Sequence, residues 1–341
     1  MKTSELLRPS LAIPLLVFAG LAALPFVATA MDQSFYIALV ARMIIYAIAA
    51  SALNLALGYG GLVSFGHALF MGLGSYAVAI SAEHGVGSGW VHLAITLVVC
   101  GAVGWITGLI SLRTSGIAFI MITLAFAQMG YYLFVSLKQY GGDDGLPVAI
   151  SSKFGPLDLG RIEVLYSVAL LILVLSTWWL AKLRSSPFGM ALRGARQNRR
   201  RVHALGLPTL RYQLVAYVFS GLLCGVSGLL LANLNAFASP STLAWVISGE
   251  LIVMVVIGGI GTVFGPVLGA IAFLGLEEII KGITEHWMVV FGPLIVVIAL
   301  LRNQGLAGLL AMWDRPPRDD EVAGNRTTKE AAANVVAKEI K

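Results

Sequence analysis

Residues 162–211 read IEVLYSVALLILVLSTWWLAKLRSSPFGMALRGARQNRRRVHALGLPTLR, an apolar run followed directly by a basic one. The apolar part, 162–183, is long enough to cross a bilayer, which needs roughly 20 apolar residues. The basic part, Lys182–Arg211, contains no acidic residue. The apolar part predicts a membrane span. The basic part predicts which end of that span faces the cytoplasm, because Lys and Arg are enriched in cytoplasmic loops.

The whole chain has the composition of a membrane protein. Of its 341 residues, 58% are hydrophobic and only 12% are charged, whereas a soluble domain carries about 25% charged residues. The net charge of +6 lies in loops beside apolar runs, so it does not indicate nucleic-acid binding. We predict an all-α, polytopic bundle of about ten transmembrane helices. The predicted spans are 11–30, 35–57, 64–82, 91–112, 116–137, 162–183, 212–234, 247–264, 266–283 and 287–302.

The lysines and arginines of the loops predict the orientation of the bundle. With the N-terminus in the cytoplasm, the sixth span delivers the basic stretch to the cytoplasm, and Arg113 also lies there. The outer loops then receive the acidic residues Asp32, Glu83, Asp143, Asp144, Asp158 and Glu285. We therefore predict an N-in, C-in bundle with an even number of spans. Arg42, about two turns into the second span, either snorkels to the outer interface or is an intramembrane charge facing a cavity or a partner subunit.

Composition divides the chain into three regions. Residues 1–34 form an N-terminal segment with the first span, 35–312 form the helical core with a cytoplasmic segment at 184–211, and 313–341 form a polar cytoplasmic tail. The first span ends in Ala-Thr-Ala at residues 28–30, which resembles a signal-peptide cleavage site. Its length and its two prolines favour a span that is retained.

Two glycine-rich stretches suggest an internal repeat. Gly-Gly-Leu-Val-Ser-Phe-Gly at 60–66 is similar to Gly-Ile-Gly-Thr-Val-Phe-Gly at 259–265, and each follows an apolar run. If the similarity is more than chance, the bundle has two weakly related halves, which is common in transporters. Gly265-Pro266 is all that separates the eighth and ninth predicted spans, so either of these is a short or broken helix or a full crossing.

The sequence carries no catalytic or metal-binding motif. Its five histidines have no metal-ligand spacing, and HExxH, GxSxG and Walker A patterns are absent from it. Glu250, Glu277 and Glu278 are the acidic residues near the interior of the later spans, which is too few for a proton relay. Cys100 and Cys224 lie in apolar runs and are interpreted as buried hydrophobic residues. We predict that the chain is not an enzyme and binds no metal or cofactor.

The basic stretch has the punctuation of a short helix or a helix pair. Pro187 can begin a helix in its first turn, and Gly206 with Pro208 can end one. Apolar residues alternate with cations between these positions, so the segment is amphipathic. It is interpreted either as an anchor on anionic lipid or as a docking element for a soluble partner. An anchor does not need the Gly and Pro punctuation, which favours docking.

Four stretches together resemble a known family. They are NLALGYGGLVSFGHALFMGLGSY at 54–76, RTSGIAFIMITLAFAQM at 113–129, GGDDGL at 141–146, and the segment 186–206 with GGIGTVFGP at 258–266. In this order they resemble the LivM-type permeases of ATP-binding-cassette importers for branched-chain amino acids. The resemblance covers about residues 35–310.

The resemblance implies a multi-subunit importer in the bacterial inner membrane. This chain and a LivH-like permease subunit would form the pathway, two separate ATPase subunits would hydrolyse ATP, and a periplasmic substrate-binding protein would deliver the amino acid. It implies that an ATPase-coupling segment includes Pro187, Phe188, Gly189, Arg193, Arg196, Asn198, Arg199, Arg200, Leu205 and Gly206. It implies pathway-lining or close-packing roles for Gly60, Gly61, Ser64, Phe65, Gly66, His67, Gly72, Gly74, Gly258, Gly259, Gly261, Gly265 and Pro266.

Two features leave alternatives open within the family. The coupling segment often reads Arg-Glu-Asn-Glu in relatives, whereas here it reads Arg-Gln-Asn-Arg at 196–199, which makes the docking face more basic. The outer loop Gly141, Gly142, Asp143, Asp144, Gly145 contacts a binding protein or forms a turn. Similar permeases are associated with urea, short amides and aromatic acids. A stand-alone carrier or channel for a small polar solute is the alternative outside the family.

Overall fold

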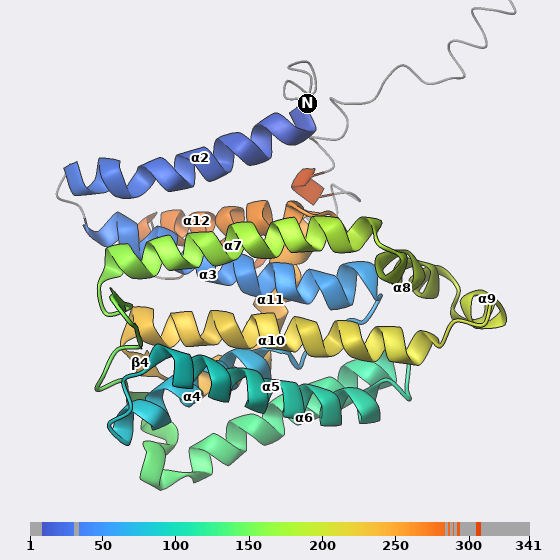
Figure 1. The fold of residues 1–341 in the computed structure, drawn as a ribbon, viewed down its shortest axis with the longest axis horizontal. Helices are drawn as coiled ribbons and strands as arrows, with labels where there is room; N and C mark the ends of the chain where they lie inside the picture. Colours follow the sequence, from blue (N-terminus) through green and yellow to red (C-terminus); the bar gives the residue numbers. More distant parts are fainter. Residues whose placement is uncertain are drawn as a thin grey trace, which may run out of the picture.

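The computed structural model describes residues 9–30 and 34–283, together with 286, 289, 292–293 and 305–307. In this part of the chain, long helices lie side by side along one direction (Figure 1). The long helices are α2 (Pro9–Ala30), α3 (Ser34–Asn54), α4 (His67–Glu83), α5 (Gly89–Ser111), α6 (Ile117–Ser136), α7 (Ile162–Ser185), α10 (Thr209–Asn235), α11 (Trp245–Gly258) and α12 (Gly265–Ile283). Two short helices, α8 (Pro187–Gln197) and α9 (Arg199–Ala204), lie between α7 and α10.

Five helical segments are long and apolar enough to cross a membrane: α5, α6, α7, α10, and α3 continued by the π-helical η1 (Leu55–Tyr59). The predicted class, a polytopic helical membrane protein, is confirmed. The count of ten spans and the N-in orientation remain predictions. Most of the predicted tenth span, 287–302, and the tail from 313 onward lie outside the described residues.

The eighth predicted span is a short helix. α11 has 14 residues, which at about 1.5 Å per residue is too short for a hydrocarbon core of about 30 Å. The third predicted span, 64–82, starts at His67 rather than at Ser64. Two side-chain hydroxyls hold the backbone before His67: Thr123 of α6 accepts the N–H of Phe65, and Ser64 accepts the N–H of Gly66. These residues therefore form a turn before the helix.

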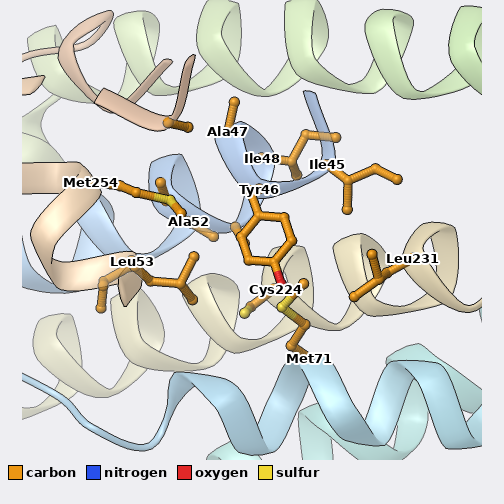
Figure 2. Packing of buried hydrophobic residues seen from close by; sticks show 14 of the residues in the cluster. Ile45, Tyr46, Ala47, Ile48, Ala52, Leu53, Met71, Cys224, Leu231 and Met254 are labelled. Atoms are coloured by element: carbon orange, nitrogen blue, oxygen red, sulfur yellow. The ribbon is translucent and has the colours of Figure 1, made fainter. Parts of the chain in front are cut away.

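The core of the bundle lies between α3, α4, α10 and α11. Figure 2 shows Tyr46 of α3 among Met71, Cys224, Leu231 and Met254, which come from the neighbouring helices. In the most apolar stretch of α3 with η1, 78% is buried inside the bundle. In the corresponding stretches of α5 and α6, 28% is buried. α3 is thus a central helix, and α5 and α6 expose much of their apolar surface, as lipid-facing helices do.

Glycines let α4 and α10 pack with their backbones in contact. A Cβ atom at Gly74 would collide with the carbonyl oxygen of Gly225, and one at Gly228 would collide with that of Met71. Small residues at such crossings are typical of membrane helices, where close packing replaces the hydrophobic effect as the attraction between helices.

The loop between α6 and α7 covers the end of the bundle opposite to α8 and α9, on the left in Figure 1. It contains the 3₁₀ turns η2 (Lys138–Tyr140) and η3 (Gly142–Asp144). Its strand β1 (Leu146–Pro147) pairs antiparallel with β4 (Phe237–Ala238), which follows α10, and β2 (Lys153–Phe154) pairs antiparallel with β3 (Leu157–Asp158). A last 3₁₀ turn, η4 (Pro240–Leu243), leads into α11.

Candidate functional site

The predicted docking segment is a helix pair. Pro187 is the first residue of α8, and the hydroxyl of Ser186 accepts the N–H of Gly189 at 3.2 Å. Asn198 separates the two helices and caps α9 by accepting the N–H of Arg201 at 3.0 Å. Gly206, with a φ of +82°, then turns the chain toward α10. The sequence punctuation therefore predicted both ends of the segment, and of its two alternatives the helix pair is the one observed.

The apolar face of α8 packs on the ends of three membrane helices. Leu192 is fully buried in a cluster with Leu55 and Tyr59 of η1, Leu180 of α7 and Ala216 of α10. The ring of Phe188 also lies 5.5 Å from that of Tyr212 on α10. Burial of this face fixes α8 against the bundle. Figure 1 shows α8 at the right end, next to the end of α7.

One arginine of α8 contacts both glycine-rich turns. The Nη1 atom of Arg196 donates to the carbonyl oxygen of Gly58, and its aliphatic stem lies against Gly61. Gly61 has a φ of +68°, and a Cβ there would lie 2.8 Å from Cγ of Arg196. A Cβ at Gly261 would lie 3.4 Å from Nη1 of the same arginine. The guanidinium is therefore next to the turn after α3 and the turn after α11.

Asn54 joins these two turns directly. Its Oδ1 accepts the N–H of Gly261 at 2.9 Å, and its Nδ2 donates to the carbonyl oxygen of Thr262 at 2.7 Å. Gly58 permits this approach, because a Cβ there would lie 2.7 Å from the nitrogen of Gly261. Asn54 and Gly58 were not among the predicted site residues. An amide side chain in an apolar run was the signal that could have indicated Asn54.

Other residues of the predicted coupling set also bind the bundle or face outward. Arg193 donates to the carbonyl oxygen of Arg184 at 2.9 Å, and Arg199 donates to that of Leu112 at 3.4 Å. Arg200 and Leu205 are exposed. The segment therefore has one face attached to helix ends and another open to a partner.

The glycine turn between α11 and α12 is tightly packed. A Cβ at Gly258 would collide with the carbonyl oxygen of Gly265, and the N–H of Gly265 donates to the Thr262 hydroxyl at 3.1 Å. Gly259 has a φ of +116°, and Pro266 is buried in the first turn of α12. These residues close the turn against the bundle.

The predicted pathway residues near His67 are packed rather than open. His67 is fully buried, and its Nε2 lies 2.7 Å from Oγ of Ser220. The ring makes edge contacts with Phe70 and Tyr217, at 5.9 and 5.8 Å between centroids. Ser64 is also fully buried. These side chains hold α4 to α10.

The remaining predicted pathway residues divide between packing and a pocket. Gly72 lies against Leu243, and Phe65 contacts Trp245 with 6.3 Å between ring centroids. By contrast, Gly60 and Gly61 line a pocket of about 500 Å³ near the basic end. Part of the remaining lining is formed by Thr114, Ser115, Gly116, Arg196, Arg199 and Gln213.

Charged side chains of α3, α11 and α12 interact with one another, which the sequence did not indicate. Lys281 and Glu277 of α12 form an ion pair at 2.5 Å. Glu250 of α11 interacts electrostatically with both and with Arg42 of α3. The Arg42 guanidinium lies 5.7 Å from the centre of the Tyr46 ring. Of the three acids near the interior of the later spans, Glu250 and Glu277 therefore interact with cations.

The outer loop adopts a glycine-rich turn. Gly141, Gly142 and Gly145 have φ values of +86°, +54° and +83°, which glycine adopts without strain. The N–H of Asp144 donates to the carbonyl oxygen of Gly141 at 3.1 Å. Asp143 and Asp144 are both exposed. In the described residues, no group of three His, Cys, Asp or Glu side chains is arranged to hold a metal.

Comparison with known proteins identifies relatives for most of this structure. The family described as "Branched-chain amino acid transport system / permease component" matches residues 35–299. The chain is 29% identical over 289 residues to the high-affinity branched-chain amino acid transport system permease protein LivM of Escherichia coli (strain K12), with 77% of this chain and 67% of that protein covered. LivM of Salmonella typhimurium gives the same identity and coverage.

A more distant relative carries a different solute name. The chain is 24% identical over 219 residues to the autoinducer 2 import system permease protein LsrC of Enterobacter sp. (strain 638), covering 62% of this chain and 61% of that protein. No solved structure matches the chain significantly. The family match begins at α3, extends past α12 and includes both glycine turns and the α8–α9 pair. The chain therefore belongs to the family of permease components of branched-chain amino acid transport systems.

Proposed function

We propose that this chain is one of two permease subunits of an ATP-binding-cassette importer that moves branched-chain amino acids into the cytoplasm of a bacterium. A LivH-like subunit is the second permease, and two separate ATPase subunits bind and hydrolyse ATP. A periplasmic substrate-binding protein delivers the amino acid to the acidic outer loop. The chain lies in the inner membrane with α8 and α9 in the cytoplasm.

Family membership makes the chain a multi-pass transport component and not an enzyme. The observation that carries the rest of the proposal is the position of α8. This helix carries Arg193 and Arg196, and Arg196 donates to Gly58 of η1 and lies against the turn before α12. A displacement of α8 by an ATPase bound on its cytoplasmic side would therefore be transmitted both to η1, which continues α3, and to the turn between α11 and α12. Charge complementarity requires an acidic groove on the ATPase, because the Glu-Asn-Glu acids of relatives are missing here.

The test is a coupling measurement on the transporter purified from its native membrane and reconstituted in liposomes. Arg196→Ala should leave ATPase subunits bound and hydrolysing ATP but should lower vanadate-sensitive uptake about tenfold, because a charged hydrogen bond contributes about 1.5–3 kcal/mol. Lys182→Ala is the matched control, since it removes an exposed cation on α7 whose ammonium contacts Trp178 of the same helix, and it should leave uptake unchanged.

Several results would contradict the proposal. Uptake by this chain without ATPases would show a stand-alone carrier or channel. Uptake of urea, a short amide or an aromatic acid in preference to leucine would retain the importer and replace the substrate. Normal uptake by the Arg196 variant would show that α8 does not couple the ATPases to the membrane helices.

Charge reversal at Arg199, Arg200 and Arg201 should also weaken co-purification of the ATPases while membrane insertion stays intact.

A further inference from the structure

A cationic pocket lies beside α8 and is lined in part by α9 of the same basic segment. It has a volume of about 630 Å³ and opens between the end of α5, helix α9 and the start of α10. Four arginines and one histidine contribute to its lining: Arg113, Arg199, Arg200, Arg211 and His203. His203 is four positions after Arg199 and three after Arg200 on α9, so its side chain is on the same side of that helix as both arginines.

Within the part of the chain that the structure describes, no acidic side chain lines this pocket. Neither Lys182–Arg211 nor the α5–α6 connection at 112–116 contains an acidic residue. Among the described residues, the ion pairs are Lys153–Asp158 and Lys281–Glu277, and neither lies at the pocket. The N-terminus of α10 adds the positive end of a helix dipole. The arginines repel one another, and an anion bound among them would relieve that repulsion.

An apolar groove continues from the cationic pocket along the bundle. This groove has a volume of about 240 Å³ and lies between α5 and α10, both of which are long enough to span a membrane. It shares Leu112, Arg113, Leu210 and Arg211 with the cationic pocket and extends to Gly108, Leu109 and Leu214. Leu109 and Leu210 are 43% and 49% exposed, as expected for side chains that face lipid.

We infer that the pocket and the groove together bind one anionic phospholipid, with its phosphate among the arginines and an acyl chain in the groove. Arg113 follows α5 by two residues, and Arg211 is the third residue of α10, so both lie at the boundary of a span, where lipid phosphates are found. Arginine binds phosphate with paired hydrogen bonds. A free phosphate or an acidic side chain would use only the cationic half, whereas a phospholipid fits both halves.

This inference gives α9 a second role beside the ATPase docking proposed for the basic segment. α8 is fixed to the bundle by its apolar face and by Arg196, and its outer face is available to the ATPase. α9 has one buried apolar residue, Val202, and its cations face the pocket at the membrane boundary. The bound lipid would hold α9 and the end of α5 together, next to the Arg199 contact with Leu112. It does so whichever solute the importer carries.

The test is native mass spectrometry of the full chain purified with its partner subunits. The complex is stripped of lipid and supplied with phosphatidylglycerol or phosphatidylcholine of identical acyl chains. We expect one phosphatidylglycerol to be retained per chain, with about tenfold weaker retention of phosphatidylcholine. Arg113→Gln combined with Arg211→Gln should lower retention of phosphatidylglycerol about tenfold. Arg201→Gln is the matched control, because Arg201 lies on α9 outside the pocket.

Additional variants and competitors in the same measurement distinguish a phospholipid from other anions in the pocket. Leu210→Gln should also weaken retention, because it makes the groove polar without changing the charge, and it serves if the double variant fails to assemble. Displacement of the lipid by glycerol 3-phosphate at equal concentration would show a phosphate site and overturn the inference. Retention by the two permease subunits alone that is lost in the complex with the ATPases would assign the pocket to an acidic partner side chain and overturn the inference. Equal retention of the two lipids would also overturn it. Uptake by the same preparations reports on the proposed function separately.

Discussion

The segments at the two ends of the bundle are held in place by different kinds of hydrogen bond. At the basic end, arginine side chains bind backbone carbonyl oxygens of other segments: Arg196 binds Gly58, and Arg199 binds Leu112. These guanidinium groups keep further donors free for a partner, since each has five N–H groups. At the opposite end, the loop between α6 and α7 is held by a buried network of neutral side chains.

That network is fully satisfied. The Nε2–H of His92 donates to the carbonyl oxygen of Val86 at 2.9 Å, so its Nδ1 accepts from the Ser152 hydroxyl at 2.7 Å. Asn233 accepts the N–H of Ser152 at 2.9 Å and donates to its hydroxyl at 3.0 Å and to the carbonyl oxygen of Leu229 at 2.8 Å. The loop is thereby fixed to α5 and α10.

This difference indicates that the two ends have different roles. Long, charged side chains at the basic end connect separate helices and leave that end accessible to an external partner. Short, neutral side chains at the other end form a rigid platform with exposed acids on its surface. Changes at the basic end should therefore disturb transmission between helices, and changes at the opposite end should disturb stability of the loop.

The largest effect is expected from Gly58→Ala. The added Cβ would collide with Oδ1 of Asn54 and lie 2.7 Å from the nitrogen of Gly261, so the two glycine turns must separate. Overpacking of this kind costs about 1–3 kcal/mol. Thermal unfolding of the purified subunit should show a lower midpoint than for Gly20→Ala, whose Cβ meets no atom within 4 Å. Equal midpoints would show that Asn54 does not join the turns.

A loss of similar free energy, but confined to one loop, is expected from Asn233→Leu at the opposite end. The change leaves the buried N–H of Ser152 unsatisfied, which costs about 1–3 kcal/mol. Hydrogen exchange should become faster in residues 146–161, while uptake per folded complex stays near that of the wild type. Asn235→Leu provides the comparison, because Asn235 is exposed two residues further along α10. Faster exchange at α8 would break the proposed separation of the two ends.

The smallest expected effect is the loss of loop stability when Asp158 is protonated at low pH. The Ser151 hydroxyl and the Gly160 N–H, which donate to its carboxylate at 2.6 and 2.9 Å, hold the pKa of Asp158 below its ordinary value of 3.8. A lowered pKa stabilises the folded loop above the unfolded-state value, and this contribution is lost as the pH falls below about 4. Asp158→Asn should remove the acid-dependent step from hydrogen exchange of residues 151–161. A step that persists in this variant would belong to another carboxylate.

Short sequence patterns predicted the features that depend on neighbouring residues alone, such as helix type and helix ends. The helical class followed from run length and composition, and Pro187 predicted where α8 begins because its fixed φ suits a first helical turn. The charge cluster around Glu250 was not predicted. Its members lie on α3, α11 and α12, so each charge looked isolated until the helices packed together. The short α11 remained one of two alternatives because Gly and Pro mark a break without saying which neighbour is short.

The sequence by itself determined that this is a membrane protein with one basic end, because apolar run length and loop charge act through the bilayer and need no tertiary contact. Only the tertiary structure decided that Asn54 meets Gly261, 207 residues away, and that Arg196 contacts both glycine turns. Contacts of this kind depend on how closely two backbones approach, and the glycines permit that approach without specifying which partner will occupy the space.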